Sequence, residues 1–282
     1  MRKIICVILA LFLASSAAFA GYQIFREYTE RQESADTYTD LENLISFPEV
    51  IPEEEPDETN LSESGETEPA PVGPTIDFAG LEEINEDCVA WIYIEDTAIN
   101  YPVVQGSDNS YYLKHLIDGK WNSAGCIFLD SRVDSDISDR HSIIYGHHMK
   151  DGSMFRSIRG YTKEDGYYDK HKTLELATPH GNYHLVVFSA FITKATDEDT
   201  YKMTYGEAEK QAYIDRAWER SELPITRDSV DVTKNDRLVT LSTCAYDYEE
   251  ARYIVMCKMV PWTKAEVQAG KDAQKQIDAQ KK

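Results

Sequence analysis

Three side chains in this sequence have the types and the order that nucleophilic acyl chemistry needs: His147, Cys244 and Arg252. A thiolate can attack a carbonyl carbon, and an imidazole can carry protons to and from the reacting amines. A guanidinium can hold the oxyanion that forms between these two events. We therefore ask whether the surrounding sequence would bring the three residues together.

Cys244 ends a strand-like segment, 237–244. Alternation along a strand puts Thr240, Ser242 and Cys244 on one face, so the thiol lies on a polar face at a strand end, where a ligand can reach it. An inert structural thiol is the competing interpretation. The other four cysteines, at 6, 88, 126 and 257, lie in apolar stretches. There we expect free thiols that pack as small hydrophobic groups.

His147 follows an apolar strand-like segment, 142–145, and a glycine, Gly146. We expect the glycine to relax the backbone where a side chain must leave the sheet. The competing interpretation is a loop histidine that only forms hydrogen bonds. Because the neighbouring His148 would point to the opposite face, and no spaced ligand motif accompanies the pair, we expect no metal site and no cofactor.

Arg252 opens the strand-like segment that follows Cys244 across a short loop, so the two residues should face each other at the end of a hairpin. An arginine there offers an oxyanion fixed donors that a flexible lysine lacks. The competing interpretation is an ordinary ion pair with Glu249 or Glu250.

About eight short strands and few helices are expected in the part of the chain that can fold. The strand-like segments are 91–94, 99–104, 126–129, 142–145, 173–177, 183–193, 237–243 and 252–260. Helices are expected at 109–115, 154–161 and 205–220, with a further short helix whose inner stripe is Leu81, Ile84 and Cys88. This pattern favours a closed or nearly closed β-barrel in a mainly β (α+β) protein.

The N-terminus carries Arg2 and Lys3 before an apolar run over 4–25, which as a helix is about 33 Å long. That length spans a bilayer, and the basic start favours a cytoplasmic N-terminus with the rest outside. Residues 1–26 are therefore predicted to be a membrane anchor. A cleaved signal peptide remains open, because Ala18 and Ala20 fit a cleavage pattern.

Residues 27–77 hold sixteen acidic residues, one basic residue and six prolines, a composition that cannot bury a core. We expect an acidic, Pro-rich extracellular linker, with a weak helix possible over 27–44. The catalytic domain should run over 78–262 and a polar tail, frayed or disordered, over 263–282. The formal net charge of −21 argues against a nucleic-acid partner.

The sequence closely resembles the sortase family, specifically its class B. The motifs that carry the resemblance are IYGH at 144–147, TLSTC at 240–244 and RYIV at 252–255, with NYPVVQG at 100–106 and GCIFLD at 125–130. The helix predicted at 205–220 is similar to the class B insertion. The resemblance covers about residues 78–260.

This resemblance implies an eight-stranded sortase barrel and a cysteine transpeptidase. Cys244 would form a thioacyl intermediate with a C-terminal, Asn-Pro-x-Thr-like sorting motif, His147 would move the protons, and Arg252 would hold the oxyanion. The acceptor would be an amine of peptidoglycan or of a lipid-linked precursor, and the catalytic domain would be a monomer. Substrate-contacting positions implied by the family are Asn109, Leu113, Ser242 and Thr243, with the backbone N–H of Ala245 helping Arg252.

Several alternatives stay open at this point. A pilin-polymerising sortase would use the same residues, and His148 could replace His147. A non-catalytic, membrane-anchored surface binding protein would also explain the anchor and the acidic segment. A cell-wall hydrolase with a His-Gly-Cys signature and a papain-type protease are disfavoured, because the first motif is absent and the second needs cysteine before histidine.

Overall fold

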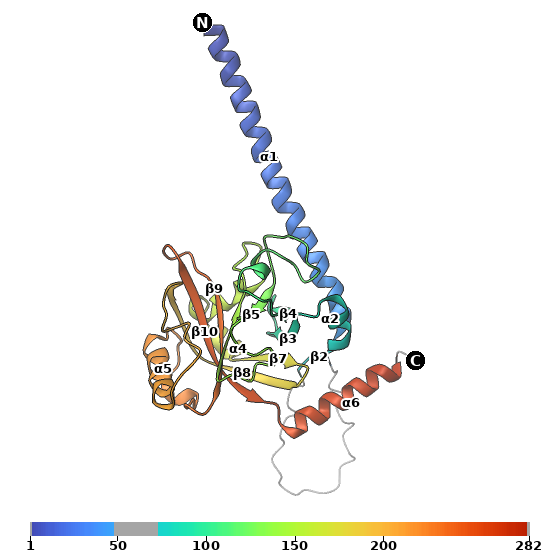
Figure 1. Cartoon of the computed structure of the whole chain (residues 1–282), viewed down its shortest axis with the longest axis vertical. Coiled ribbons are helices and arrows are strands. Elements are labelled where there is room, and N and C mark those ends of the chain that lie inside the picture. The colour runs from blue at the N-terminus through green and yellow to red at the C-terminus, as the bar shows by residue number, and fades with distance from the viewer. Residues whose placement is uncertain (1, 48–72, 281–282) are drawn as a thin grey trace, which may run out of the picture.

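The computed structural model describes residues 2–47 and 73–280, and its centre is a closed eight-stranded barrel (Figure 1). The strands are β3 (Cys88–Tyr93), β4 (Asn100–Val104), β5 (Ile127–Leu129), β6 (His141–Tyr145), β7 (Thr173–Thr178), β8 (Gly181–Lys194), β9 (Arg237–Cys244) and β10 (Ala251–Pro261). Around the barrel the order is β10-β8-β7-β3-β4-β5-β6-β9. The predicted barrel is confirmed, and each predicted strand is present with ends shifted by a few residues.

Two of the neighbouring strand pairs, β4 with β5 and β6 with β9, are parallel, and the other pairs are antiparallel. Parallel neighbours end at the same edge of a sheet, which matters for the site below. Along β9, Val239 and Leu241 point into the barrel core and are fully buried. Thr240 and Ser242 lie on the outer face, yet they are also buried, because another layer covers that face.

That outer layer is α5 (Glu207–Arg220) and the segment before it. The helix packs on β8 and forms a second apolar cluster in which Phe188, Ile214 and Ile254 are fully buried. The predicted helix at 205–220 is therefore present. Its position explains why the polar side of β9 is not open to water over most of its length.

The remaining helices are short or peripheral. They are α2 (Phe78–Ile84), α3 (Gly160–Lys163), α4 (Tyr167–His171), α6 (Lys264–Gln280) and the 3₁₀ turns η1 (Leu41–Leu44), η2 (Tyr111–Leu113), η3 (Phe155–Arg159) and η4 (Arg227–Ser229). The helix expected at 109–115 is only the turn η2. The stripe expected through Ile84 and Cys88 is wrong, because α2 ends at Ile84. Asn85 there adopts an extended conformation and its side chain donates to the carbonyl of Ile117.

The first helix, α1 (Arg2–Asp40), projects from the barrel as one continuous rod (Figure 1). One apolar stretch in it is long enough to cross a membrane. Its last turns lie against the barrel, where the Tyr38 hydroxyl donates to the carbonyl of Gly125 and Leu41, in η1, is buried. The main-chain carbonyl of Glu30 accepts a hydrogen bond from the Asn122 side chain.

These contacts differ from the acidic spacer expected over 27–77. A few side chains on one helix face suffice for docking, while most of the acidic side chains on the other face remain in water. A short pair of strands, β1 (Ile45–Ser46) and β2 (Thr75–Ile76), then joins the two sides of the segment 48–72, which lies outside the described residues. Composition averaged over fifty residues concealed this docking face.

Candidate active site

The parallel pairing of β6 with β9 sets the relative positions of His147 and Cys244. Tyr145 lies beside Ser242 in the ladder, and the N–H of Gly146 donates to the carbonyl of Ser242 at 3.1 Å. His147 and Cys244 are each two residues further along their chains. They therefore leave neighbouring strands at the same level and on the same face.

The antiparallel pairing of β9 with β10 adds the third residue, because Cys244 is the direct register partner of Arg252. All three side chains line one groove with a volume of about 650 Å³. Strands β6, β9 and β10 are consecutive around the barrel, so closure of the barrel brings together residues about a hundred positions apart. The structure therefore brings together the three side chains that the sequence predicts to lie at one site.

His147 is held from the opposite wall of the groove. Its Nε2 lies 2.8 Å from the carbonyl oxygen of Leu113. A carbonyl oxygen only accepts, so Nε2 carries the hydrogen and Nδ1 is the nitrogen left for proton exchange. This contact fixes both the tautomer and the orientation of the ring.

Gly146 precedes His147 for a reason different from the one expected. Its φ is not in the left-handed region, so conformational freedom is not what the position needs. A Cβ there would lie 2.5 Å from Ile127 Cδ1 and 2.7 Å from the ring of Phe155. Only a residue without a side chain fits between the barrel core and η3. This close packing at Gly146 sets the path of the backbone that leads to His147.

Arg252 does not form the ion pair that was the competing interpretation. Its Nη1 donates to the carbonyl of Ala251 at 3.0 Å, and both Glu249 and Glu250 are exposed. The same carbonyl accepts the N–H of Ala245 at 3.0 Å. The oxyanion role considered for Ala245 is therefore corrected: its N–H is already bonded, and the residue does not line the groove.

The four other family-implied positions all line the groove. The Asn109 side chain accepts from the N–H of Ser131 at 2.8 Å, which fixes the loop that carries it. Ser242 shares a hydrogen bond of 3.0 Å with the Tyr201 hydroxyl. Thr243 is buried, and its hydroxyl has no hydrogen-bond partner among the described residues.

Sequence reasoning missed a buried acid beneath the groove. Asp130 accepts from the Tyr145 hydroxyl at 2.8 Å and pairs with Arg132 at 2.6 Å, and both of these partners line the groove. Burial alone would raise the pKa of Asp130, but the hydrogen bonds from Arg132, Asn109 and Tyr145 outweigh it and lower the pKa to about 2. Its position at the end of the GCIFLD motif was the available signal.

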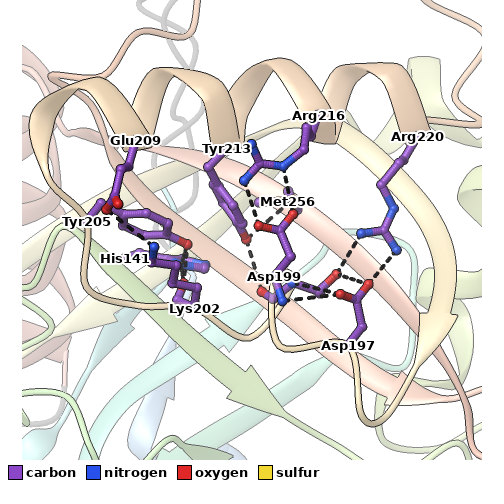
Figure 2. A network of polar contacts seen from close by, with 11 residues as sticks. His141, Asp197, Asp199, Lys202, Tyr205, Glu209, Tyr213, Arg216, Arg220 and Met256 are labelled. Carbon is purple, nitrogen blue, oxygen red and sulfur yellow. Dashed lines mark hydrogen bonds and ion pairs between the residues drawn. The ribbon is translucent and has the colours of Figure 1, made fainter.

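A second missed feature is the groove wall formed by the segment before α5, shown in Figure 2. Asp197 lines the groove and pairs with Arg220 of α5 at 2.8 Å, while Asp199 pairs with Arg216 at 2.6 Å. Burial opposes ionisation of Asp197, yet hydrogen bonds from Thr193 and Arg220 lower its pKa to about 2. The helix thus holds one wall of the groove by two ion pairs.

The alternative histidine and the other thiols lie elsewhere. His148 is buried and does not line the groove; burial and the nearby Arg156 and Arg159 lower its pKa to about 4. Burial raises the pKa of Cys88 and Cys126 to about 12, so both remain thiols. In the two described ranges, no group of three or more His, Cys, Asp or Glu side chains is arranged to hold a metal ion.

Known proteins resemble this chain over most of its length. The family model described as "Sortase domain" matches residues 92–260. The chain belongs to the sortase family. Sortase B of Staphylococcus aureus is 31% identical over 264 residues, which cover 92% of this chain and 98% of the relative. Sortase B of Listeria monocytogenes is 30% identical and covers 92% and 96%.

Solved sortase B structures agree with this assignment. The Staphylococcus aureus sortase B–substrate complex superposes with a TM-score of 0.60 at 35% identity, over 66% of this chain and 85% of that one. Clostridium perfringens sortase B gives 0.60 at 31% identity, over 65% and 100%. The resemblance to class B sortases is confirmed, and the activity is that of a cysteine transpeptidase that anchors surface proteins through a sorting signal. A pilin polymerase and a non-catalytic binding protein are not favoured.

Proposed function

We propose that Cys244, His147 and Arg252 are the catalytic residues of this transpeptidase. The observation that carries the proposal is the register of three consecutive barrel strands, which places these side chains at one level of a single groove. A thiol, a proton carrier and a fixed guanidinium at one place supply the three functions that acyl transfer through a thioester needs.

The first half-reaction acylates the enzyme. The sulfur of Cys244 attacks the carbonyl carbon at the scissile bond of the sorting motif, and Arg252 donates to the oxyanion that forms. The C–N bond then breaks, and His147 gives a proton to the departing amine. The product is a thioester on Cys244.

The second half-reaction transfers the acyl group. An acceptor amine attacks the thioester carbon and loses a proton to His147, and the C–S bond breaks to return the thiolate. The two half-reactions need no oxidant and no cofactor. The nitrogen that gives and takes the proton would be Nδ1 of His147, since Nε2 donates to the carbonyl oxygen of Leu113.

The groove is proposed to bind an Asn-Pro-x-Thr-like motif, with Asn109, Leu113, Ser242 and Thr243 among its contacts. One similar structure is described as a sortase B–substrate complex and another as sortase B complexed with triglycine, which supports a sorting peptide and an amine as the two substrates.

We also propose how the enzyme is placed relative to the cell membrane. Residues 1–26 would form a single-pass membrane anchor, and the domain 78–262 would lie outside the cell as a monomer with 263–282 as a tail. The segment 27–77 would join the anchor to the domain, with its first part docked on the barrel through Tyr38 and Leu41. The apolar stretch of α1 supports the anchor.

Product analysis tests the function. The protein is incubated with a peptide that contains Asn-Pro-x-Thr and with triglycine or diaminopimelate. The products are separated and their masses are measured by mass spectrometry. We expect cleavage and a new amide to the amine in the wild type, and neither in Cys244→Ala. Cleavage that survives in Cys244→Ala would refute the assignment.

A further inference from the structure

A second hollow, of about 590 Å³, shares no lining residue with the catalytic groove. The groove is lined by His147 and Cys244, and the hollow by the residues that follow them, His148 on one segment and Tyr246 on the other. The Tyr246 hydroxyl donates to the carbonyl of His148 at 3.3 Å, which ties the two segments together. The hollow therefore lies outside the groove, and two of its lining residues closely follow His147 and Cys244 in the chain.

Basic side chains concentrate in this hollow, although the chain as a whole has a net charge of −21. Arg156, Arg159 and Lys163 line it, from η3 and α3. Arg156 and Lys163 are exposed, and neither forms an ion pair with a carboxylate in the described part of the chain. Two cations are thus available to a ligand that enters.

The third cation already holds a carboxylate. Arg159 donates to both oxygens of Asp247 at 2.7 and 2.8 Å. Its other terminal nitrogen is buried and has no hydrogen-bond partner within residues 2–47 and 73–280. Its guanidinium also stacks 4.6 Å from the ring centroid of Tyr253, which fixes its plane. The hollow therefore accommodates a carboxylate on a rigid arginine, with unused donors beside it.

His148, which is neutral, also makes the hollow more favourable for an anion. Arg156 donates to Nε2 of His148, so the hydrogen of that ring is on Nδ1, which is buried and has no hydrogen-bond partner in the part of the chain that the structure describes. Within the hollow, only Asp247 and Glu164 carry negative charge against the three basic residues. An anionic group would gain donors there without displacing a strong internal pair at Arg156 or Lys163.

We propose that this basic hollow binds a carboxylate of the acceptor amine and thereby selects acceptors that carry one close to the reacting nitrogen. The inference rests on the proposed function. Because the acyl chain occupies the groove, the amine must reach the thioester from outside it, and the hollow is where its carboxylate would be held. The reacting centre of diaminopimelate, with amine and carboxylate on one carbon, has the required chemistry.

The first test measures transfer from the preformed acyl-enzyme to diaminopimelate and to the same molecule with that carboxylate converted to an amide. We expect KM for the carboxylate form to be at least about tenfold lower in the wild type, which corresponds to about 1.4 kcal/mol. Arg156→Gln with Lys163→Gln should abolish this difference and leave the rate of acylation unchanged. Lys170→Gln, an exposed lysine outside the hollow, is the matched control.

A second test needs no acylation, so it separates this inference from the proposed function. Diaminopimelate and its amide are titrated into the Cys244→Ala protein and followed by NMR of the arginine side chains. The carboxylate form should bind more tightly, and Asp247→Asn should strengthen its binding by releasing Arg159. Equal binding of the two forms, or displacement of diaminopimelate by far lower concentrations of pyrophosphate, would overturn the assignment to an acceptor carboxylate.

Discussion

The carbonyl oxygen of Leu113 and Nε2 of His147 are joined by a 2.8 Å hydrogen bond across the groove. The position of that carbonyl depends on Gly125, whose Cβ, if present, would lie 2.8 Å from the Leu113 oxygen and 2.4 Å from the Tyr112 oxygen. A glycine that does not line the groove thus leaves room for the carbonyl that holds the histidine.

Gly125→Ala is therefore expected to impair catalysis more than stability alone explains. The added methyl must displace the carbonyl that orients His147, and a displacement near 1 Å can cost about a hundredfold in rate. We expect kcat/KM to fall by at least about tenfold, measured with a sorting peptide.

Gly119→Ala provides the control for that variant. Gly119 also has a positive φ, +78° against +58° for Gly125, but its nearest neighbour to a Cβ is 3.7 Å away. Both variants carry the strain of a left-handed alanine, about 1 kcal/mol, and only one moves the carbonyl. Equal losses of activity would show that the contact with His147 is unimportant.

Arg252→Lys should lose most of the activity although it keeps the charge. The planar guanidinium is anchored by its bond to the Ala251 carbonyl, and a lysine cannot present the same fixed donors. Loss of one oxyanion donor typically costs about 10²–10³ in kcat, so we expect kcat to fall by that order with little change in thermal unfolding. Arg237→Lys, at the far end of β9, is the control. Near-normal kcat in Arg252→Lys would exclude the oxyanion role.

The end of α1 is expected to be part of the stable fold. A chain that begins at residue 75 lacks the buried Leu41 and the hydrogen bond from Tyr38 to Gly125. Burial of one leucine is worth about 2–5 kcal/mol against alanine, so this chain should unfold at a temperature several degrees below that of a chain beginning at residue 27.

Leu41→Ala in the longer chain should reproduce much of that loss, whereas Glu42→Ala, at an exposed position, should not. Differential scanning calorimetry measures all four proteins. If the two chain lengths melted together, the docking of α1 would contribute nothing, and the spacer expected from composition would begin before residue 41.

Acid should destabilise the domain through His141. This ring is fully buried between the Lys202 carbonyl and the Thr240 hydroxyl, each at 2.8 Å, and burial together with the nearby Lys210 charge lowers its pKa to about 4. The unfolded chain binds a proton near pH 6.5, and the folded one only near pH 4. Stability is therefore lost as pH falls between these values, by about 2–3 kcal/mol.

Urea unfolding at pH 7.5 and pH 4.5 measures this change in the free energy of unfolding with pH. His141→Gln should be less stable than the wild type at pH 7.5 but should lose less free energy of unfolding between the two pH values. An unchanged slope in the variant would assign acid sensitivity to other groups.

Much of this molecule could be predicted from periodicity and local motifs. The eight strands follow from alternating apolar residues, and the pairing of Cys244 with Arg252 follows from a short hairpin. Contacts between distant segments could not be predicted in this way. The hydrogen bond from His147 to Leu113 and the buried carboxylate of Asp130 depend on closure of the barrel, which no local pattern encodes.

The docking of α1 was missed for a related reason. The helix and the turn η1 after it contribute only a few contacts, such as those of Tyr38 and Leu41, within a segment whose average composition is that of a solvated chain. The role of Gly146 was also misjudged, because close packing against Phe155 is a property of the assembled core and not of the backbone alone.

Intact-mass spectrometry of the acyl-enzyme tests the central claim most directly. The wild type, Cys244→Ala and Cys257→Ser are each mixed with a sorting-type peptide and weighed before and after addition of an amine. We predict a thioacyl adduct in the wild type and in Cys257→Ser that disappears when the amine is added, and no adduct in Cys244→Ala. An adduct that persists in Cys244→Ala, or one lost in Cys257→Ser with the fold intact, would contradict the assignment of Cys244 as the nucleophile.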